Sequence, residues 1–124
     1  MSCPIISIVD DDEGTRLATV SLVRSLGWQA RGYASADEFL NSGEIGETSC
    51  LISDIFMPGM SGIDMHTRLL DLGHALPTIF ITALPSPDLK ATVRAKGTLA
   101  LALLEKPIDA NAIEQLLKHT LGQP

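Results

Sequence analysis

Four short apolar segments of the chain each lead into side chains that could take part in metal or phosphoryl chemistry. One segment is followed by three consecutive carboxylates and another ends at a single carboxylate, while the remaining two lead to a hydroxyl and to an ammonium group. The residues concerned are Asp10, Asp11, Asp12, Asp54, Thr82 and Lys106. In an open sheet of parallel strands, ligands bind outside the carboxyl ends of the strands. We therefore expect these side chains to meet at one edge of a sheet.

Carboxylates gathered at one edge repel one another, so such a group requires a cation. Hard oxygen ligands favour Mg²⁺, which prefers octahedral coordination and keeps several waters. Beside such an ion, a carboxylate can attack a phosphoryl group, while the metal and a lysine balance the charge on the transferring oxygens. The hydroxyl of Thr82 could bond one phosphoryl oxygen, and the compact charge of Lys106 could approach another.

Each of these residues also has an ordinary structural explanation. Asp12 can cap the helix that follows it, and we favour that role over direct metal contact. Asp10 and Asp11, taken singly, are equally well explained as loop acids. Thr82 alone is most simply a β-branched strand residue, and Lys106 alone a solvated surface lysine. The joint placement of the set supports the chemical interpretation more than any single member does.

Several other kinds of site lack support in the sequence. Neither GxGxxG nor GxxxxGK[ST] occurs, so no cradle for nucleotide phosphates is indicated. His66, His74 and His119 lack the spacing and cysteine partners of a zinc site, and there is no GxSxG motif for triad chemistry. A haloacid-dehalogenase-type phosphotransferase remains a minor alternative, because Gly14 stands where its aspartate motif requires Thr or Val.

The elements that would position these residues alternate between strand-like and helix-like patterns. Apolar runs at 5–9, 50–53 and 78–82, with a weaker one at 101–105, are typical of strands covered on both faces. The more polar segment 29–33 predicts an edge strand. Helical patterns occupy 17–26, 35–40, 63–72, 88–96 and 109–121. In the first helix we expect one apolar stripe, formed by Leu17, Val20, Leu22, Val23 and Leu26.

This alternation predicts an α/β fold, with a single five-stranded parallel sheet and five helices distributed over both of its faces. The chain has 124 residues, which suits one domain with one core. We find no internal repeat, linker or low-complexity segment.

Composition and charge exclude several classes of partner. The formal net charge is −6, which disfavours direct binding to nucleic acid or to anionic lipid. No apolar run has the length of a membrane span, and the N-terminus lacks the basic region of a signal peptide. Two cysteines are too few for a disulfide framework. From these features we expect a cytoplasmic protein.

Together, these motifs resemble the receiver domain of two-component response regulators. The matching stretches are "IVDDDEG" (8–14), "SDIFMPGMSG" (53–62), "IFITA" (79–83) and "LEKP" (104–107), in the order that the family has them. They span nearly the whole chain. The opening "VDDDE" and the stretch "YASADEFL" (33–40) look most similar to the nitrogen-fixation regulator type.

The resemblance implies a role for each candidate residue. Asp54 would be the phosphoacceptor, taking its phosphoryl group from the phosphohistidine of a sensor histidine kinase. Asp11, Asp54 and the backbone carbonyl of Phe56 would ligate Mg²⁺, and Asp10 would act mainly through water. Thr82 and Lys106 would close on the phosphoryl oxygens, and the Lys106–Pro107 peptide would be cis.

For the whole chain, the resemblance implies a flavodoxin-like sheet with strand order 2-1-3-4-5. Residues 1–124 would form a receiver domain that switches a separate output domain, usually a helix-turn-helix transcription factor. Such a domain is not an enzyme in its own right, since it assists only its own phosphorylation and dephosphorylation. Its partners would be the sensor kinase and, after phosphorylation, a second copy of the chain.

One feature departs from the family pattern. Receivers usually couple the threonine to an aromatic residue on the fifth strand, but the corresponding position here is Leu103, and residues 99–104 contain no aromatic residue. This leaves open whether the usual dimer forms through the fourth and fifth helices. It also keeps a second interpretation, a degenerate receiver that signals by protein contacts without phosphorylation.

Overall fold

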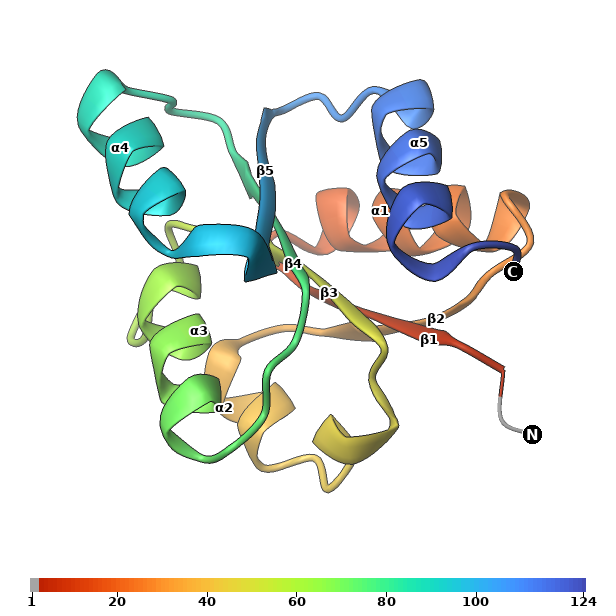
Figure 1. Cartoon of the computed structure of the whole chain (residues 1–124), viewed down its shortest axis with the longest axis horizontal. Helices are drawn as coiled ribbons and strands as arrows, with labels where there is room; N and C mark the ends of the chain where they lie inside the picture. The colour runs from red at the N-terminus through yellow and green to blue at the C-terminus, as the bar shows by residue number, and fades with distance from the viewer. Residues whose placement is uncertain (1–2) are drawn as a thin grey trace.

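The strands and helices alternate along the chain in the computed structural model, which describes residues 3–124 (Figure 1). The strands are β1 (Ile5–Val9), β2 (Gln29–Tyr33), β3 (Cys50–Asp54), β4 (Thr78–Thr82) and β5 (Ala100–Glu105). The helices are α1 (Glu13–Ser25), α2 (Ala36–Leu40), α3 (Gly62–Asp71), α4 (Pro87–Ala95) and α5 (Ala110–Leu121). Two short 3₁₀ turns, Ile45–Glu47 and Gly97–Leu99, precede β3 and β5.

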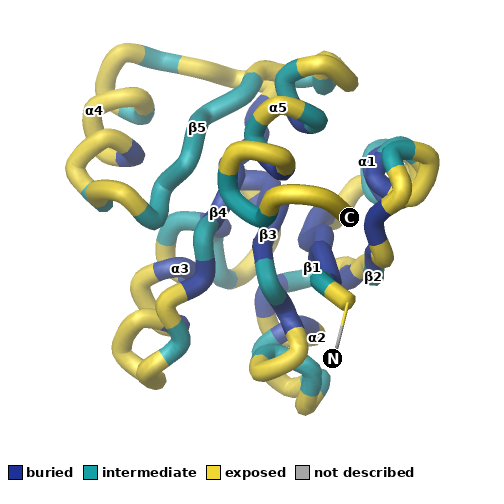
Figure 2. Tube along the Cα trace, turned by 45° about the vertical axis from the view of Figure 1, so that its right-hand side comes forward, coloured by how far each residue is buried: buried dark blue, intermediate teal, exposed yellow. Residues whose placement is uncertain are grey.

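The five strands form one parallel sheet in the order β2-β1-β3-β4-β5. Both the α/β class and the strand order expected from the sequence are confirmed. The segment at 29–33 is an edge strand as predicted, and β5 is the edge on the other side. Figure 2 shows the central strands buried, whereas β5 is only half-buried and the helices are exposed on their outer sides.

The helices cover both faces of the sheet because successive strand residues point in opposite directions. On β4, Ile79 and Ile81 pack with residues of α1 and α5, whereas Phe80 packs on the opposite face with Val93 of α4. Helices α2 and α3 share that second face, where Phe39 joins another apolar cluster. This two-sided cover explains why the central strands are apolar at nearly every position.

One detail of the predicted packing is wrong. Leu17 was expected in the apolar stripe of the first helix, but its side chain is 57% exposed. The buried face of α1 is instead centred on Thr19, Val20 and Val23. At about 3.6 residues per turn, residue 17 lies more than a quarter turn around the helix from the centre of this buried face, on the side open to solvent.

Helices α1, α3 and α4 begin before the segments predicted from the apolar pattern, whereas α5 begins one residue after its predicted start. Asp12, Ser61, Ser86 and Asp109 accept backbone hydrogen bonds at the starts of α1, α3, α4 and α5. These caps fix where each chain segment leaves the carboxyl edge of the sheet. None of the helices within residues 3–124 combines the length and the apolar character needed to cross a membrane.

Candidate functional site

Three carboxylates meet at the carboxyl edge of the sheet. Asp10 follows β1 directly, Asp11 is the next residue, and Asp54 is the last residue of β3. Oxygen atoms of the three carboxylates all lie within 4.8 Å of one another. Asp10 and Asp54 are buried, whereas Asp11 is exposed. The structure therefore brings together residues separated by more than forty positions, as the strand-end argument predicted.

Lys106 supplies the positive charge in this cluster. Its Nζ lies 3.1 Å from Asp10 Oδ2 and 3.4 Å from Asp54 Oδ2. Burial disfavours the charged ammonium, but the contacts with Asp10 and Asp54 outweigh it, so the pKa of Lys106 is raised. Its backbone N–H donates to the carbonyl of Thr82 at 2.8 Å, and the Lys106–Pro107 peptide is cis. The lysine thus follows β5 in a backbone conformation tied to β4.

The environment of Asp54 disfavours the ionised form of its carboxyl group. Burial and the nearby Asp10 carboxylate raise the pKa of Asp54 to about 6, although the Lys106 ammonium acts in the opposite direction. Near neutral pH the carboxylate is ionised but poorly compensated. A second cation at this edge would therefore stabilise it.

The backbone around Asp54 is held by contacts from the start of α3. Ser53 Oγ donates to the carbonyl oxygen of Asp54 at 2.9 Å, and the N–H of Gly62 donates to the carbonyl of Ile55 at 2.9 Å. A Cβ at position 62 would overlap the Asp54 carbonyl oxygen and lie 2.7 Å from Ser53 Oγ. A residue without a side chain is required here, because α3 begins in direct contact with the end of β3.

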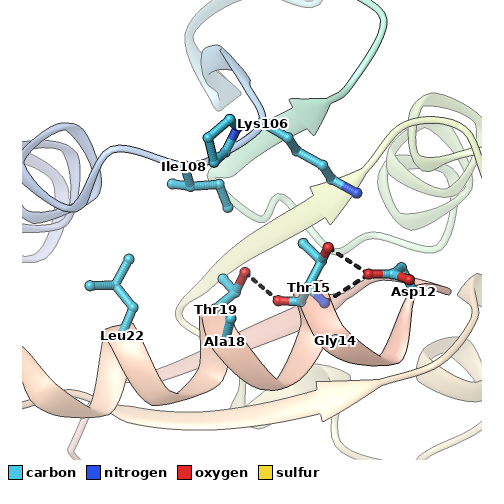
Figure 3. A pocket seen from close by; sticks show the side chains of 9 residues that line it. Asp12, Gly14, Thr15, Ala18, Thr19, Leu22, Lys106 and Ile108 are labelled. Carbon is cyan, nitrogen blue, oxygen red and sulfur yellow. Dashed lines mark hydrogen bonds between the residues drawn. The ribbon is translucent and has the colours of Figure 1, made fainter.

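Asp12 is the helix cap that we favoured. Its Oδ2 accepts the N–H of Thr15 at 2.8 Å and the hydroxyl of Thr15 at 2.6 Å, which lowers the pKa of Asp12 (Figure 3). It does not belong to the group of three carboxylates that meet at the edge of the sheet. The side chain next to it in sequence, Asp11, is the one left free at the edge.

Thr82 and Phe56 are close to the cluster in the chain trace but are not joined to it by side-chain contacts within the described residues. Thr82 is buried, and its hydroxyl accepts the N–H of Leu84 at 3.0 Å. Phe56 lies two residues beyond Asp54, and its side chain is 54% exposed. The structure thus brings Asp10, Asp11, Asp54 and Lys106 together, whereas the Thr82 side chain makes its hydrogen bond with the backbone of Leu84.

The carboxylate cluster fits a hard divalent cation. Asp10 Oδ2 is buried, and within residues 3–124 no group donates a hydrogen bond of acceptable geometry to it, which leaves the ion pair with Lys106 as its compensation. A buried carboxylate oxygen normally has hydrogen-bond donors or a metal ion as partners. The donor set is made of carboxylate oxygens, which Mg²⁺ prefers in proteins.

A surface groove of about 580 Å³ adjoins the cluster on the side of α1. Its floor is mostly apolar, with Ala18 and Leu22 on α1 facing Ile108, while Asp12 and Lys106 lie at one end (Figure 3). The site is therefore open to solvent along the first helix.

Sequence reasoning missed three residues that support the site. Ser53 and Gly62 appeared only as parts of a quoted motif, although both contact the Asp54 backbone. Arg16 was not considered, yet its Nη1 donates to the carbonyl of Asp10 at 2.9 Å. The sequence did contain a sign of the contacts made by Ser53 and Gly62, because a residue without a side chain stands where α3 begins. No sequence signal revealed the reach of Arg16, because it depends on how α1 lies against β2.

Known proteins share both the sequence pattern and the fold. The family model for the response regulator receiver domain matches residues 6–118. Response regulator protein TmoT of Ectopseudomonas mendocina is 40% identical over 105 residues, which cover 83% of this chain and 46% of the relative. Transcriptional regulatory protein FixJ of Azorhizobium caulinodans is 30% identical over 118 residues, covering 95% of this chain and 55% of the relative. The chain thus spans about half the length of these curated relatives.

Solved structures agree with this assignment. The structure of response regulator StyR superimposes with a TM-score of 0.82 at 32% sequence identity, over 97% of this chain and 60% of StyR. The similarity to FixJ agrees with the nitrogen-fixation regulator subtype expected from the opening motif. The receiver match over nearly the whole chain decides against the haloacid-dehalogenase alternative. The chain belongs to the response regulator receiver domain family.

Proposed function

We propose that this receiver domain accepts a phosphoryl group on Asp54 from the phosphohistidine of a sensor histidine kinase. Asp54 ends a buried strand at the open edge of the sheet and has a lysine ammonium 3.4 Å from its Oδ2. These features suit a carboxylate nucleophile that must be ionised yet poorly stabilised. The raised pKa of Asp54, about 6, still leaves it ionised near neutral pH.

In the proposed step, a carboxylate oxygen of Asp54 attacks phosphorus and forms an acyl phosphate. The bond between phosphorus and the imidazole nitrogen of the donor breaks, its electron pair stays on that nitrogen, and the imidazole leaves as a neutral or protonated base. Lys106 already contacts Asp54 and can compensate negative charge on the phosphoryl oxygens. The Thr82 hydroxyl, which accepts the N–H of Leu84, would donate its own hydrogen to another of these oxygens.

Mg²⁺ is the cofactor that we propose for this site. Asp11, Asp54 and the backbone carbonyl of Phe56 would hold it, with Asp10 acting through water. Bound there, the ion would neutralise charge on the phosphoryl oxygens. This assignment is supported by the grouping of the three carboxylates within 4.8 Å and by the buried Oδ2 of Asp10, whose one partner among the described residues is the Lys106 ammonium.

The observation that carries the proposal is the convergence of Asp10, Asp11, Asp54 and Lys106 at one edge of the sheet. Intact-mass measurement after incubation with phosphoramidate and Mg²⁺ tests it. We expect the wild type to gain one phosphoryl group, Asp54→Asn to gain none, and Asp71→Asn, an exposed control on α3, to behave as wild type. Equal labelling of Asp54→Asn would refute the assignment of the nucleophile.

We further propose that phosphorylation regulates a transcriptional output. The name of FixJ, a transcriptional regulatory protein, and the greater length of the curated relatives support this part of the proposal. Residues 1–124 would act as the receiver domain of a response regulator in the cytoplasm, with the sensor kinase and a second phosphorylated copy as partners. Phosphorylation-dependent dimerisation, followed by light scattering, tests the last point.

Leu103 favours a second candidate, a receiver that signals without phosphorylation. It stands on β5 opposite Phe80 of β4 and packs in the apolar cluster that contains Val93. Because Leu103 is not aromatic, the chain lacks the aromatic side chain that usually moves together with the threonine in receivers. The mass measurement separates the two candidates, because a degenerate receiver would acquire no covalent label under any of these conditions.

A further inference from the structure

The β1–α1 loop, which holds two of the clustered carboxylates, is tied to helix α1 by an arginine. Arg16 lies in the second turn of α1, and its Nη1 donates to the backbone carbonyl of Asp10 at 2.9 Å. This carbonyl lies just beyond the end of β1, where no further strand pairing is available to it. A buried carbonyl without a partner is costly, so the arginine replaces the missing sheet hydrogen bond.

The bond has a geometric consequence for Asp11. The carbonyl of Asp10 belongs to the peptide group that joins Asp10 to Asp11, and a peptide group is planar. Fixing its oxygen therefore fixes the plane from which the backbone of Asp11 starts. The N–H of Asp10 donates to the carbonyl of Tyr33 at 3.1 Å, and Asp10 Oδ1 accepts the N–H of Asp12 at 3.0 Å. Arg16 completes the restraint on this loop.

The neighbouring strand makes room for the arginine. Gly32 of β2 lies against the Arg16 side chain, and a Cβ at this position would lie 3.3 Å from Arg16 Cγ and 3.2 Å from Val20 Cγ2. Contacts this short would push the aliphatic part of Arg16 away from the sheet. The glycine therefore leaves the Arg16 side chain room to lie against β2 while its guanidinium bonds the carbonyl of Asp10.

We propose that Arg16 is a positioning residue that orients the Asp10–Asp11 peptide for Mg²⁺ binding. This inference rests on the metal site of the proposed function. When the arginine is removed, the loss of its charge and the loss of its orienting bond should change the affinity for Mg²⁺ in opposite directions. Loss of a positive charge beside three carboxylates would, by Coulomb attraction alone, tighten the binding of Mg²⁺. Loss of the orienting hydrogen bond weakens it.

Isothermal titration of the chain with MgCl₂ distinguishes the two effects. Arg16→Met keeps the aliphatic contacts but loses both the donor and the charge. Arg24→Met is the matched control, because Arg24 Nη2 donates to the carbonyl of Ala30 at 2.8 Å from the far end of the same helix. We expect Arg16→Met to raise the Kd for Mg²⁺ about tenfold, as is usual when a residue that orients metal ligands is lost. Arg24→Met should bind as wild type does.

Two further measurements make the outcome decisive. A merely structural role would lower the Tm of both variants and leave both Kd values unchanged, which would overturn the inference. Unchanged or tighter binding by Arg16→Met, with normal binding by wild type, would also overturn it without touching the proposed function. In metal-free protein, the amide resonances of Asp11 and Asp12 should shift in Arg16→Met and not in Arg24→Met. If wild type itself binds no Mg²⁺, the proposed metal site fails, and this inference fails with it.

Discussion

Asp54 combines two demands that oppose each other. As the proposed nucleophile it must be ionised, and as the last residue of a buried strand it lies where ionisation is costly. The ammonium of Lys106 compensates only part of this cost, so the pKa of Asp54 stays raised, at about 6. We infer that the residue stores unfavourable electrostatic energy in the metal-free protein. Cation binding or phosphorylation would each change that energy.

This conflict predicts that Asp54→Asn stabilises the metal-free protein at neutral pH. Because the pKa of Asp54 is raised from 3.8 to about 6, the folded state binds the proton more tightly, and stability from this group is lost as pH rises through that window. Asparagine does not ionise, so the Asp54→Asn variant does not lose this stability as the pH rises. In urea unfolding with EDTA, we expect a gain of about 1–3 kcal/mol at pH 7.5 and a smaller gain at pH 4.5.

Asp71→Asn, on the exposed end of α3, is the control for this experiment and should change the free energy of unfolding by less than about 0.5 kcal/mol. A difference between Asp54→Asn and wild type that is the same at both pH values would contradict the electrostatic account.

At the scale of elements, the start of α3 packs through Gly62 against the backbone of Asp54, the proposed nucleophile. A methyl group there would overlap the carbonyl of Asp54, so Gly62→Ala must displace either the helix or the end of β3. We expect it to lower the free energy of unfolding by about 1–3 kcal/mol, measured by urea denaturation. Gly46→Ala, where a Cβ would meet nothing within 4 Å, is the matched control. Equal effects of the two substitutions would show that contact with Asp54 is unimportant.

A second element-scale feature is the buried histidine of α3. His66 is 1% exposed, neither ring nitrogen has a hydrogen-bond partner among the described residues, and its ring centroid lies 5.5 Å from that of Phe80. Burial and the nearby ammonium of Lys96 lower the pKa of His66. The folded state therefore binds this proton less readily, so the stability it contributes is present above the ordinary pKa of 6.5 and is lost as pH falls below it.

We expect His66→Met to lose less stability than wild type when the pH is lowered. Urea midpoints measured at pH 7.5 and 5.5 should fall further for wild type than for this variant. His119→Gln, at an exposed position of α5, should behave as wild type does. If wild type and His66→Met lose the same stability over this range, the histidine does not protonate on unfolding in the way described.

At the scale of the whole molecule, the proposed Mg²⁺ site would link metal binding to folding. Asp11 is exposed, so Asp11→Ala should leave the metal-free Tm unchanged or slightly higher, because a repelling charge is removed. Saturating Mg²⁺ should stabilise wild type, by about 2.7 kcal/mol at one hundred times Kd, and should stabilise the variant much less. Thermal unfolding with and without Mg²⁺ measures both. A metal-free Tm of Asp11→Ala well below that of wild type would contradict the repulsion argument.

Much of this molecule could be predicted from its sequence, because parallel strands and strand-end chemistry follow simple rules. The apolar runs that precede Asp10 and Asp54 located two central strands, and the order of the sheet brought their ends together. Helix starts were less accurate, since polar caps such as Ser86 carry no apolar periodicity. Leu17 was misplaced because its apolar spacing did not reveal which side of α1 packs against the sheet.

What the sequence could not supply are contacts that depend on the distance between elements. The bond from Arg16 to the carbonyl of Asp10 depends on how α1 lies against β2, where the Arg16 side chain packs over Gly32. The bond that the hydroxyl of Thr82 accepts from the N–H of Leu84 is another such contact, and nothing in the sequence indicated it. The roles of all the site residues in phosphoryl transfer and metal binding stay predictions, namely those of Asp10, Asp11, Asp54, Phe56, Thr82 and Lys106.

The central claim is that Asp54 carries the phosphoryl group, and reduction of the labelled protein tests it most directly. After incubation with phosphoramidate and Mg²⁺, borohydride converts an acyl-phosphorylated aspartate to homoserine, which peptide mass spectrometry locates. The account predicts homoserine at position 54, and only when both the phosphodonor and Mg²⁺ were present. Homoserine at position 10, 11 or 12 instead, or a reduced peptide map identical to that of untreated protein, would contradict it.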